Sequence, residues 1–333
     1  MRVVISGFGT VGRSLVELML ERGALRRLSV VAVVDSRGAA LSERGLSERA
    51  LRELLRAPRG GVSSHPEHGQ PGVGTVSVLR EVEADALVEL TPSDYNSGEP
   101  GLGHTLEAIE RGVDVVLANK SPIALMGLEL LERARERGVR VLYRATVMGG
   151  TPLVPLVSSL RGSVRRIYGV LNATTNYVLT LVHELGLPFA DALRRAQGEG
   201  VAEADPSLDV DGLDPAAKLA ILACTLGVDM RVGDVERESL RSAPLEEAAE
   251  RRRAGLVPKY VARLELSDGG ARASVRLEYV RADDPLAGVR GLYNGVYVET
   301  GENRIFISGL GAGGRPTAEA VLEDLLSLAG WWP

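Results

Sequence analysis

A cluster of carboxylates followed by one lysine is the stretch of this 333-residue sequence with the clearest capacity for chemistry. Its acidic residues, with no basic residue among them, are Glu203, Asp205, Asp209, Asp211 and Asp214. Asp214 as N-cap and Pro215 as the first helical residue predict the start of a helix, which places Lys218 in its first turns. The positive end of a helix disfavours an ammonium, which would help Lys218 to transfer a proton.

Two other interpretations fit the same stretch. It also looks like a solvated acidic loop with a surface lysine. A calcium loop is a second alternative, but the Asp209-Val-Asp211-Gly spacing does not continue into the EF-hand pattern. Lysine usage favours chemistry, because only Lys120, Lys218 and Lys259 are lysines among 39 basic residues, and lysine, unlike arginine, can exchange a proton.

Composition limits the class of protein. The hydrophobic content of 45% is ample for a core, and the length predicts two domains, or one with a large insertion. A net charge of −5 without a basic patch argues against nucleic acid as a partner. We expect no membrane span and no signal peptide. The single Cys224 excludes an intrachain disulfide framework, and we expect a cytoplasmic protein.

A glycine-rich turn near the N-terminus predicts a dinucleotide site. A buried strand at 2–6 leads into the turn, and an amphipathic helix at 13–22 and a strand at 28–34 follow. The glycines suit a tight turn, a close approach of backbone to pyrophosphate, and helix–strand packing, while the helix N-terminus favours phosphate. The residues of the turn expected to bind the cofactor are Gly7, Phe8, Gly9, Thr10, Val11 and Gly12.

The ribose-binding position leaves the choice between NAD and NADP open. Asp35 lies 23 residues after Gly12, where an acid accepts hydrogen bonds from the ribose hydroxyls of NAD. Arg37 could instead hold the 2′-phosphate of NADP, or be a solvated loop residue. Residues 58–74, rich in Gly, Pro, Ser and His, predict a surface loop over the cofactor side, with His65 and His68 exposed rather than metal-binding.

Two further predicted strands, at 85–91 and 112–118, end in polar residues. Ligands bind at the carboxyl ends of strands in open parallel sheets, so we expect Lys120 to reach the reacting atoms. The alternative is that Lys120 merely starts a helix. The other residues expected to contact the cofactor here are Thr91, Pro92, Ser93 and Asn119.

The second half of the chain predicts a domain of different character. Strands with alternating apolar and polar residues indicate a sheet with one covered face. A glycine-rich turn at 309–314 then opens a returning helix and brings Gly311 near the cofactor. We predict an α/β, Rossmann-type nucleotide-binding domain at 1–148, completed by 309–333. The rest, 149–308, is predicted to be an α+β substrate and dimerisation domain with a mixed or antiparallel sheet.

These segments resemble the homoserine dehydrogenases, and the resemblance spans nearly the whole chain. It is carried by the Gly7–Gly12 turn, Thr91-Pro-Ser-Asp-Tyr95, Ala118-Asn-Lys120, Gly149-Gly-Thr-Pro152, Asn172-Ala-Thr-Thr-Asn-Tyr177, the 203–218 block and Pro316-Thr-Ala-Glu-Ala-Val321. The chain looks like the short form, without a fused aspartokinase or a regulatory ACT domain. Feedback control through such a domain is therefore not expected.

The resemblance implies NAD(P)-dependent interconversion of L-homoserine and L-aspartate 4-semialdehyde, in threonine, methionine and isoleucine biosynthesis, by a homodimer. Lys218 and Lys120 match the two family lysines at the reacting oxygen. The residues matching those that hold the substrate or order its site are Glu203, Asp209, Asp214 and Thr174.

Two departures from the family pattern lie near the substrate. Ala173 stands where the family often has Gly before the pocket threonine, and Val201 stands where it often has Tyr. Either change would loosen or reshape the contact with substrate.

A third departure concerns a sodium ion. Many members have Glu at the position of Arg144, where it joins backbone carbonyls around the ion. We expect the Arg144 guanidinium to take the cation's place, donate to carbonyls near Val147, Gly149 and Thr151, and abolish monovalent metal binding. The alternative is that Arg144 swings outward and a weaker carbonyl-only site survives.

Two rival functions remain. One is another amino-acid or semialdehyde dehydrogenase of the same architecture. The other is a non-catalytic NAD(P)-binding regulator, whose signature would be the loss of Lys120 or Lys218, and neither residue is lost.

Overall fold

The computed structural model describes residues 1–267, 269–311 and 313–331, which form two compact units. Unit 1 comprises Met1–Gly150 and Gly313–Pro333, and unit 2 comprises Thr151–Ala312. The sequence placed the two boundaries two and four residues earlier, after 148 and after 308. Ala312, part of the predicted glycine turn, lies outside the described residues.

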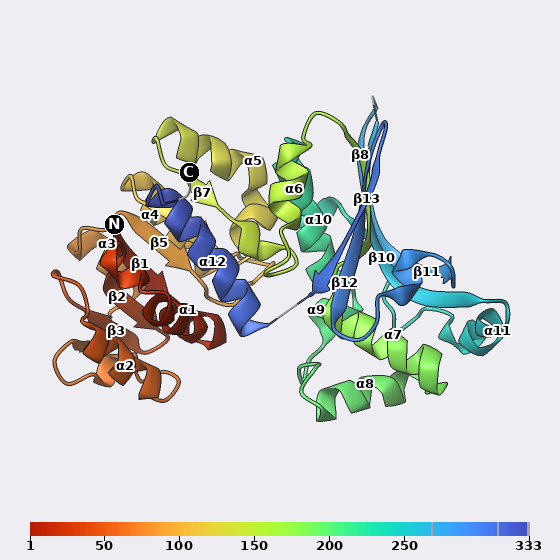
Figure 1. The fold of residues 1–333 in the computed structure, drawn as a ribbon, viewed down its shortest axis with the longest axis horizontal. Coiled ribbons are helices and arrows are strands. Elements are labelled where there is room, and N and C mark those ends of the chain that lie inside the picture. The colour runs from red at the N-terminus through yellow and green to blue at the C-terminus, as the bar shows by residue number, and fades with distance from the viewer. Residues whose placement is uncertain (268, 312, 332–333) are drawn as a thin grey trace. The chain divides into compact units, whose positions relative to one another are not determined.

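Unit 1 is built on a seven-stranded sheet with the order β4-β3-β2-β1-β5-β6-β7 (Figure 1). Its strands are β1 Arg2–Ser6, β2 Ser29–Asp35, β3 Gly38–Leu41, β4 Gly69–Pro71, β5 Ala86–Glu89, β6 Asp114–Leu117 and β7 Val141–Leu142. The strands from β2 to β7 in this order run parallel, and β3 and β4 add an antiparallel edge. The chain order reverses between β1 and β5, which is where ligands bind in such sheets.

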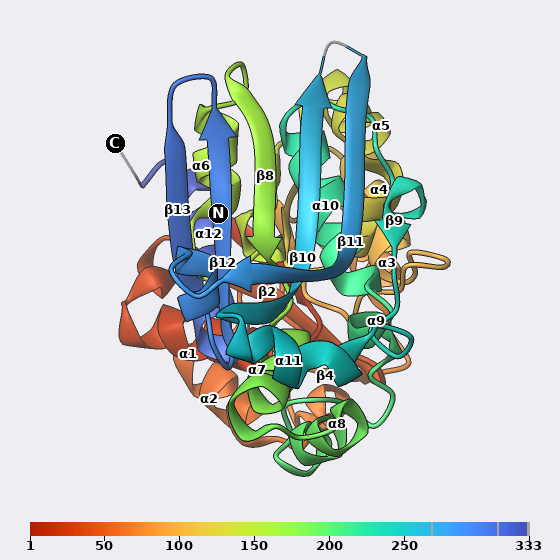
Figure 2. The same cartoon turned by 90° about the vertical axis from the view of Figure 1, so that its right-hand side faces the viewer.

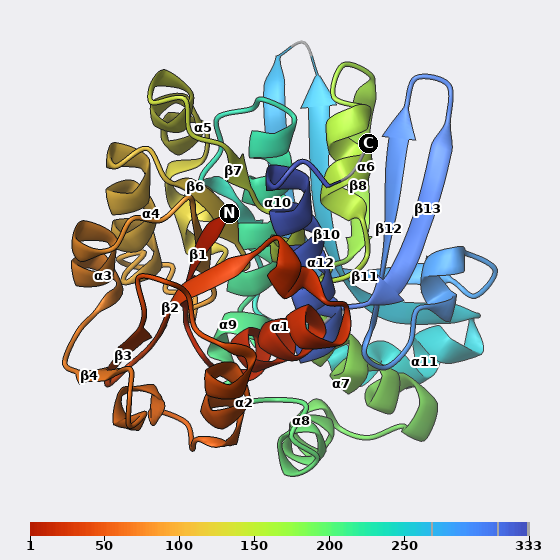
Figure 3. The same ribbon diagram turned by 60° about the vertical axis from the view of Figure 1, so that its left-hand side comes forward.

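Helices cover both faces of this sheet (Figure 3). They are α1 Thr10–Glu21, α2 Glu48–Arg56, α3 Thr75–Glu81, α4 Gly101–Glu110, α5 Ser121–Glu136 and α12 Gly314–Leu328. α1 contacts α12, and α4 contacts α3 and α5. The Rossmann-type arrangement is confirmed. The edge strands β3 and β4 were not predicted, because neither is long enough to show an alternating pattern.

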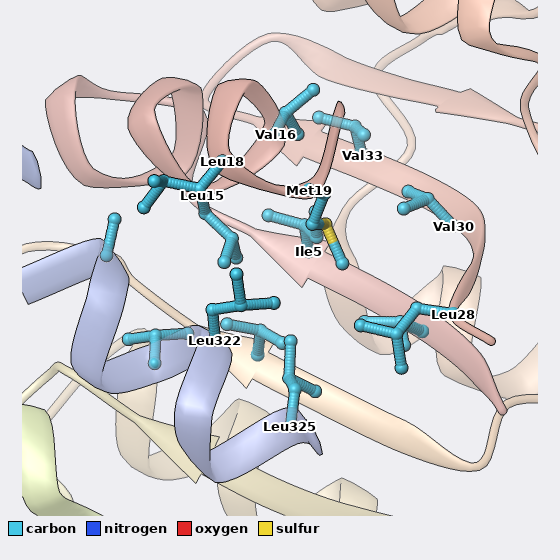
Figure 4. Packing of buried hydrophobic residues seen from close by; sticks show 14 of the residues in the cluster. Ile5, Leu15, Val16, Leu18, Met19, Leu28, Val30, Val33, Leu322 and Leu325 are labelled. Atoms are coloured by element: carbon cyan, nitrogen blue, oxygen red, sulfur yellow. The ribbon is translucent and has the colours of Figure 1, made fainter. Parts of the chain in front are cut away.

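The returning helix α12 is part of the core of unit 1. Leu322 and Leu325 of α12 pack with Leu15 and Leu18 of α1 and with Ile5 of β1, and all five side chains are fully buried (Figure 4). Burying a leucine of this kind contributes about 2 kcal/mol. The first 150 residues therefore complete their core only with a segment that lies some 160 residues further along the chain.

Unit 2 is a six-stranded sheet with the order β13-β12-β8-β10-β11-β9 (Figure 2). Its strands are β8 Val164–Val170, β9 Glu236–Arg237, β10 Leu256–Ser267, β11 Gly270–Arg281, β12 Tyr293–Thr300 and β13 Arg304–Leu310. Only β9 and β11 pair in parallel, so the predicted mixed sheet is confirmed. The helices are α6 Leu153–Ser159, α7 Ala173–Leu185, α8 Phe189–Gly198, α9 Ser207–Val210, α10 Leu213–Thr225 and α11 Ala248–Arg253.

Among the residues that the structure describes, no helix combines the length and the apolar character needed to cross a lipid bilayer.

Arg144 ties α12 to the turn that precedes the unit boundary. Its Nε donates to Asp324 Oδ1 at 2.6 Å and its Nη1 to Glu323 Oε2 at 2.7 Å. The side chain of Asp324 is only 3% exposed, and burial raises its pKa to about 6 while Arg144 pulls it down. The predicted donation to the carbonyls of the turn is therefore not observed. Two carboxylates, one of them buried, attract a guanidinium more strongly than neutral carbonyls do.

Replacing Arg144 with Met should lower the free energy of unfolding by about 3 kcal/mol, because the Asp324 carboxylate would stay buried without its counter-ion. Arg133→Met is the matched control, since its partner Glu129 is exposed and the loss should stay below about 0.5 kcal/mol. Guanidinium unfolding followed by circular dichroism measures both. Equal losses would contradict a stabilising buried pair.

Candidate active site

A cavity of about 610 Å³ lies in unit 1 at the carboxyl ends of β1 and β5. This volume is in the range of cofactor and ligand sites. It is lined by Ser6, Gly7, Phe8, Gly9, Thr10, Val11, Val34, Asp35, Ser36, Arg59, Gly60, Gly74, Thr75, Leu90, Thr91, Pro92, Pro100 and His104. Five of the six residues of the glycine turn border it, together with the predicted ribose acid.

The glycine turn has the shape that a pyrophosphate needs. Gly7 adopts a φ of +97°, and a Cβ there would come within 2.7 Å of the Leu90 carbonyl carbon, so only glycine fits. A Cβ on Gly9 would meet nothing within 4 Å, so its backbone is open to approach from the cavity. α1 begins at Thr10, and the unsatisfied N–H groups of its first turn favour an anion. The residues present fit a dinucleotide.

The cavity is bordered by Asp35, the predicted ribose acid, and by Arg59, which the sequence did not single out. Asp35 accepts hydrogen bonds from the backbone N–H of Arg37 at 2.9 Å and of Val62 at 3.0 Å. Arg37 is exposed, and its stem lies beside Gly60. Arg59 borders the cavity and donates from Nη2 to Thr10 Oγ1 at 2.9 Å. Arg59 lies in the loop that the sequence predicted to cover the cofactor side, and this position could have marked it as a candidate.

The loop at 58–74 is more ordered than the sequence suggested. It contains β4, and His65, expected to be exposed, is 8% exposed. His65 Nε2 lies 3.1 Å from Glu53 Oε2 of α2.

Hydrogen bonds join the ends of β5 and β6. Ser93 Oγ donates to Asn119 Oδ1 at 3.0 Å and accepts from the backbone N–H of Lys120, also at 3.0 Å. Thr91 and Pro92 border the cavity. Lys120 is the N-cap residue of α5, directly after the carboxyl end of β6. These contacts fix the Lys120 backbone relative to the loop that follows β5.

A buried carboxylate beneath these loops was missed in the sequence. Glu89, the last residue of β5, is 0% exposed and lies 2.7 Å from His104 Nδ1 through its Oε2. Its Oε1 accepts from the backbone N–H of Thr91 at 2.8 Å. An acid at the end of an otherwise apolar strand was the available signal.

The acidic block of unit 2 surrounds a buried lysine. Lys218 is 6% exposed, its Nζ donates to the Leu171 carbonyl at 2.6 Å, and it lies 2.8 Å from Asp214 Oδ2. The N-cap of α10 is Gly212, so the predicted N-cap role of Asp214 is wrong. Asp214 lies in the first turn instead, where its side chain reaches Lys218 one turn later.

Asn172, which the sequence left without a role, joins the two inner carboxylates. Its Nδ2 donates to Asp209 Oδ1 at 2.6 Å and to Asp214 Oδ2 at 2.8 Å. Its Oδ1 caps α7 by accepting from the Thr175 N–H at 2.9 Å, which fixes the orientation of the amide. Burial and the neighbouring Asp214 raise the pKa of Asp209, and Asn172 opposes this shift.

The remaining predicted substrate residues border this cluster. Thr174 Oγ1 donates to the Val201 carbonyl at 3.4 Å. The Glu203 side chain is exposed, and its backbone carbonyl accepts from Gln197 Nε2 at 3.2 Å. The structure thus brings Asp209, Asp214 and Lys218 together and leaves Glu203 on the surface of unit 2.

The other predicted positions are distributed between the units. Gly311 groups with unit 2, where its N–H donates to the Leu292 carbonyl at 3.0 Å. Val147 and Gly149 lie in unit 1, and Thr151 opens unit 2. In the described part of the chain, no group of three or more His, Cys, Asp or Glu side chains is placed to hold a metal ion.

Comparison with known proteins matches both halves of the chain to one family. The family model "Homoserine dehydrogenase, NAD binding domain" matches residues 7–144, and the model "Homoserine dehydrogenase" matches residues 155–326. A homoserine dehydrogenase of Methanocaldococcus jannaschii is 35% identical, with 98% of each chain covered. An NAD(+)-dependent homoserine dehydrogenase of Pseudomonas canavaninivorans is also 35% identical, covering 98% of this chain and 96% of the relative.

The fold agrees with these sequence matches. A hyperthermophilic archaeal homoserine dehydrogenase solved in complex with NADPH has a TM-score of 0.84 and 28% identity, with 100% of this chain and 98% of that chain covered. The glycine turn, Asp35 and the lysine–carboxylate cluster lie within the matched segments. The chain therefore belongs to the homoserine dehydrogenase family of NAD(P)-dependent oxidoreductases.

Proposed function

We propose that this chain interconverts L-homoserine and L-aspartate 4-semialdehyde with the Asp209–Asp214–Lys218 cluster as its chemical centre. The observation that carries the proposal is a buried lysine whose Nζ contacts one carboxylate and one carbonyl, in a helix that belongs to the family-matched segment. When bound, the nicotinamide supplies the acceptor or donor of hydride. All other steps fall to the chain's own residues.

In the oxidation, Lys218 acts in its neutral amine form, takes the proton of the substrate hydroxyl as the adjacent carbon loses hydride, and becomes an ammonium. Lys120, at the carboxyl end of β6, assists. In the reduction, the Lys218 ammonium polarises the aldehyde oxygen and returns the proton. Asp214, 2.8 Å from Nζ, keeps the ammonium oriented through both directions.

The substrate carries its own charges, which the acidic residues match. Glu203 is exposed, so its carboxylate is available to the amino group of homoserine. Asp209 and Asp214 order the site through Asn172, and Thr174 lines it. We further propose that the protein works in the cytoplasm, in biosynthesis of threonine, methionine and isoleucine, as the family relationship implies.

Lys218→Met should lower kcat by on the order of 10²–10⁴-fold, because the proton acceptor is lost. Lys259→Met is the matched control, since Lys259 is also buried in unit 2 but hydrogen-bonds to Asn176 and Val289, away from the acidic cluster. Initial rates with L-homoserine measure kcat, and dinucleotide binding shows that each variant is folded. A kcat for Lys218→Met near that of the control would contradict the assignment.

The cofactor is NAD or NADP, and the structure holds elements suited to each. Asp35 borders the cavity where the adenosine ribose would lie. Arg37 lies two residues on, and Arg59 stands over the phosphate turn. We propose that Arg59 faces the phosphates through its contact with Thr10, and that Arg37 meets the 2′-phosphate when NADP is bound.

Arg37→Ala should raise KM for NADP⁺ about tenfold and leave KM for NAD⁺ within about twofold, because only NADP carries the phosphate. Arg44→Ala serves as the control, because it removes an exposed arginine near Ser29, at the opposite end of β2 from Asp35. Parallel titrations of both cofactors at saturating homoserine give the two ratios. Equal changes for NAD⁺ and NADP⁺ would place Arg37 away from the 2′ position.

We propose a homodimer formed through the sheet of unit 2. α10 contacts one face, on which Ala262 and Leu264 are fully buried. On the opposite face the cross-strand register places Tyr168 beside Arg263 and Tyr297. That face, seen from the front in Figure 2, carries arginines and glutamates in nearest-neighbour pairs. Such a surface is complementary to a second copy of itself.

The wild-type chain should sediment as a dimer, and Phe306→Glu should convert it to a monomer. Phe306 lies on the same face, with its ring 4.8 Å from that of Tyr297, and glutamate there would remove this ring contact and bring a charge into the buried interface. Sedimentation velocity at micromolar concentration measures the state. A monomeric wild type, or a dimeric Phe306→Glu variant, would contradict this interface.

A further inference from the structure

The Glu89 carboxylate is surrounded by hydrogen-bond donors. Thr91 donates to Oε1 through its backbone N–H and through its hydroxyl. Asn119 Nδ2 lies 3.5 Å from the same oxygen, and His104 Nδ1 lies 2.7 Å from Oε2. A backbone N–H and a side-chain amide nitrogen can only donate, so Oε1 of Glu89 is an acceptor. An ionised Glu89 also accepts through Oε2, which faces His104 Nδ1.

This arrangement selects one tautomer of His104. A carboxylate that accepts from Nδ1 places the single proton of a neutral imidazole on Nδ1, which leaves a lone pair on Nε2. The Ser6 hydroxyl lies 3.3 Å from the same Nδ1 and 2.8 Å from Thr75 Oγ1. The Nδ1 atom of His104 is thus hydrogen-bonded, while its Nε2 atom has a lone pair available to a ligand.

One wall of the cofactor cavity includes His104. His104 borders that cavity, as do Ser6, Thr75 and Thr91. Its side chain is 14% exposed, and Nε2 makes no hydrogen bond to any residue that the structure describes. A dinucleotide offers several donors to such an acceptor, namely its ribose hydroxyls and its amide and amine N–H groups.

We propose that His104 Nε2 accepts a hydrogen bond from the bound dinucleotide, and that Glu89 is the positioning residue that holds the imidazole in the accepting tautomer. This inference rests on the dinucleotide site of the proposed function. It assigns a cofactor-contacting role to a residue on α4, outside the glycine turn and the strand ends. The opposite tautomer would present a donor to the same group and lose the bond.

The tautomer can be measured directly, because the chain has only four histidines. In protein labelled with ¹⁵N-histidine, the ring-nitrogen shifts of His104 should report a protonated Nδ1 and an unprotonated Nε2. Addition of NAD⁺ or NADP⁺ should shift the Nε2 resonance of His104, assigned by its absence in His104→Asn. A His104 signal that reports protonated Nε2, or that does not move with cofactor, would overturn the proposal.

Two substitutions test Nε2 of His104 and the carboxylate of Glu89 individually. In His104→Asn the amide can still donate to Glu89 from the position of Nδ1, but nothing replaces Nε2. We expect the Kd for the dinucleotide to rise about tenfold, KM for the cofactor to rise in parallel, and kcat at saturating cofactor to stay within about twofold. An unchanged Kd would overturn the proposal.

Glu89→Gln tests the positioning role. The glutamine oxygen would stay with Thr91 and its NH₂ group would face His104, which drives the imidazole to the other tautomer. We expect the ring-nitrogen shifts to exchange and the Kd to rise at least as much as in His104→Asn. Glu53→Gln is the matched control, because Glu53 pairs with His65 outside the cavity lining, and the Kd should not change.

The outcomes also separate this inference from the proposed function. If the wild type binds neither dinucleotide, both the role of His104 and the proposed function are contradicted. If the wild type binds the dinucleotide and oxidises homoserine, but the His104 resonance does not shift and His104→Asn leaves the Kd unchanged, only the role of His104 is contradicted. Should Glu89→Gln fail to fold, the wild-type titration and His104→Asn still decide the question.

Discussion

The chemistry that we propose depends on a lysine that is buried and still able to exchange a proton. An ammonium that is only 6% exposed needs a counter-ion and further acceptors, and Asp214 and the Leu171 carbonyl supply them. Those carboxylates in turn need donors, and Asn172 supplies one to Asp209 and one to Asp214. Removing Lys218 or Asp214 would leave the other buried charge without its counter-ion, and removing Asn172 would take a donor from each carboxylate. Asn172 also caps α7, so the start of that helix is tied to the cluster.

In unit 1, a second buried charged group, Glu89, lies beside the cofactor cavity. The parallel strands of this unit converge on the point where the chain order reverses, and the glycine turn and the first turn of α1 line the cavity there. The buried Glu89 gathers donors from the loop after β5, from Asn119 and from α4. One carboxylate thus holds together loops from three parts of the chain. The same residues that border the cavity are linked to the backbone of Lys120 through Asn119 and Ser93.

Much of the fold and of the candidate site could be predicted from the sequence, because short segments of the chain determine these features. The glycine turn, the β-branched strands and the acidic block each carry their signal within a few residues. The two-domain plan and the mixed second sheet followed from the change in periodicity along the chain. The family comparison then supports the activity that the resemblance implied.

What could not be predicted depends on contacts between distant segments. The guanidinium of Arg144 pairs with Asp324, 180 residues away, so its partners are invisible to local pattern. The edge strands β3 and β4 are too short to show an alternation, and Glu89 looks like one polar residue in an apolar strand. The N-cap of α10 is Gly212 and not Asp214 as predicted. Gly212 has a φ of +78°, a left-handed conformation that suits glycine, and Asp214 is then available to Lys218.

The most direct test of the central claim is the absorbance of reduced nicotinamide with purified wild-type chain, L-homoserine, and NAD⁺ or NADP⁺ in parallel. The account predicts turnover with at least one cofactor, and much slower turnover with alcohols that lack the amino group. No turnover with either cofactor at neutral and alkaline pH, or equal rates with alcohols lacking the amino group, would contradict it.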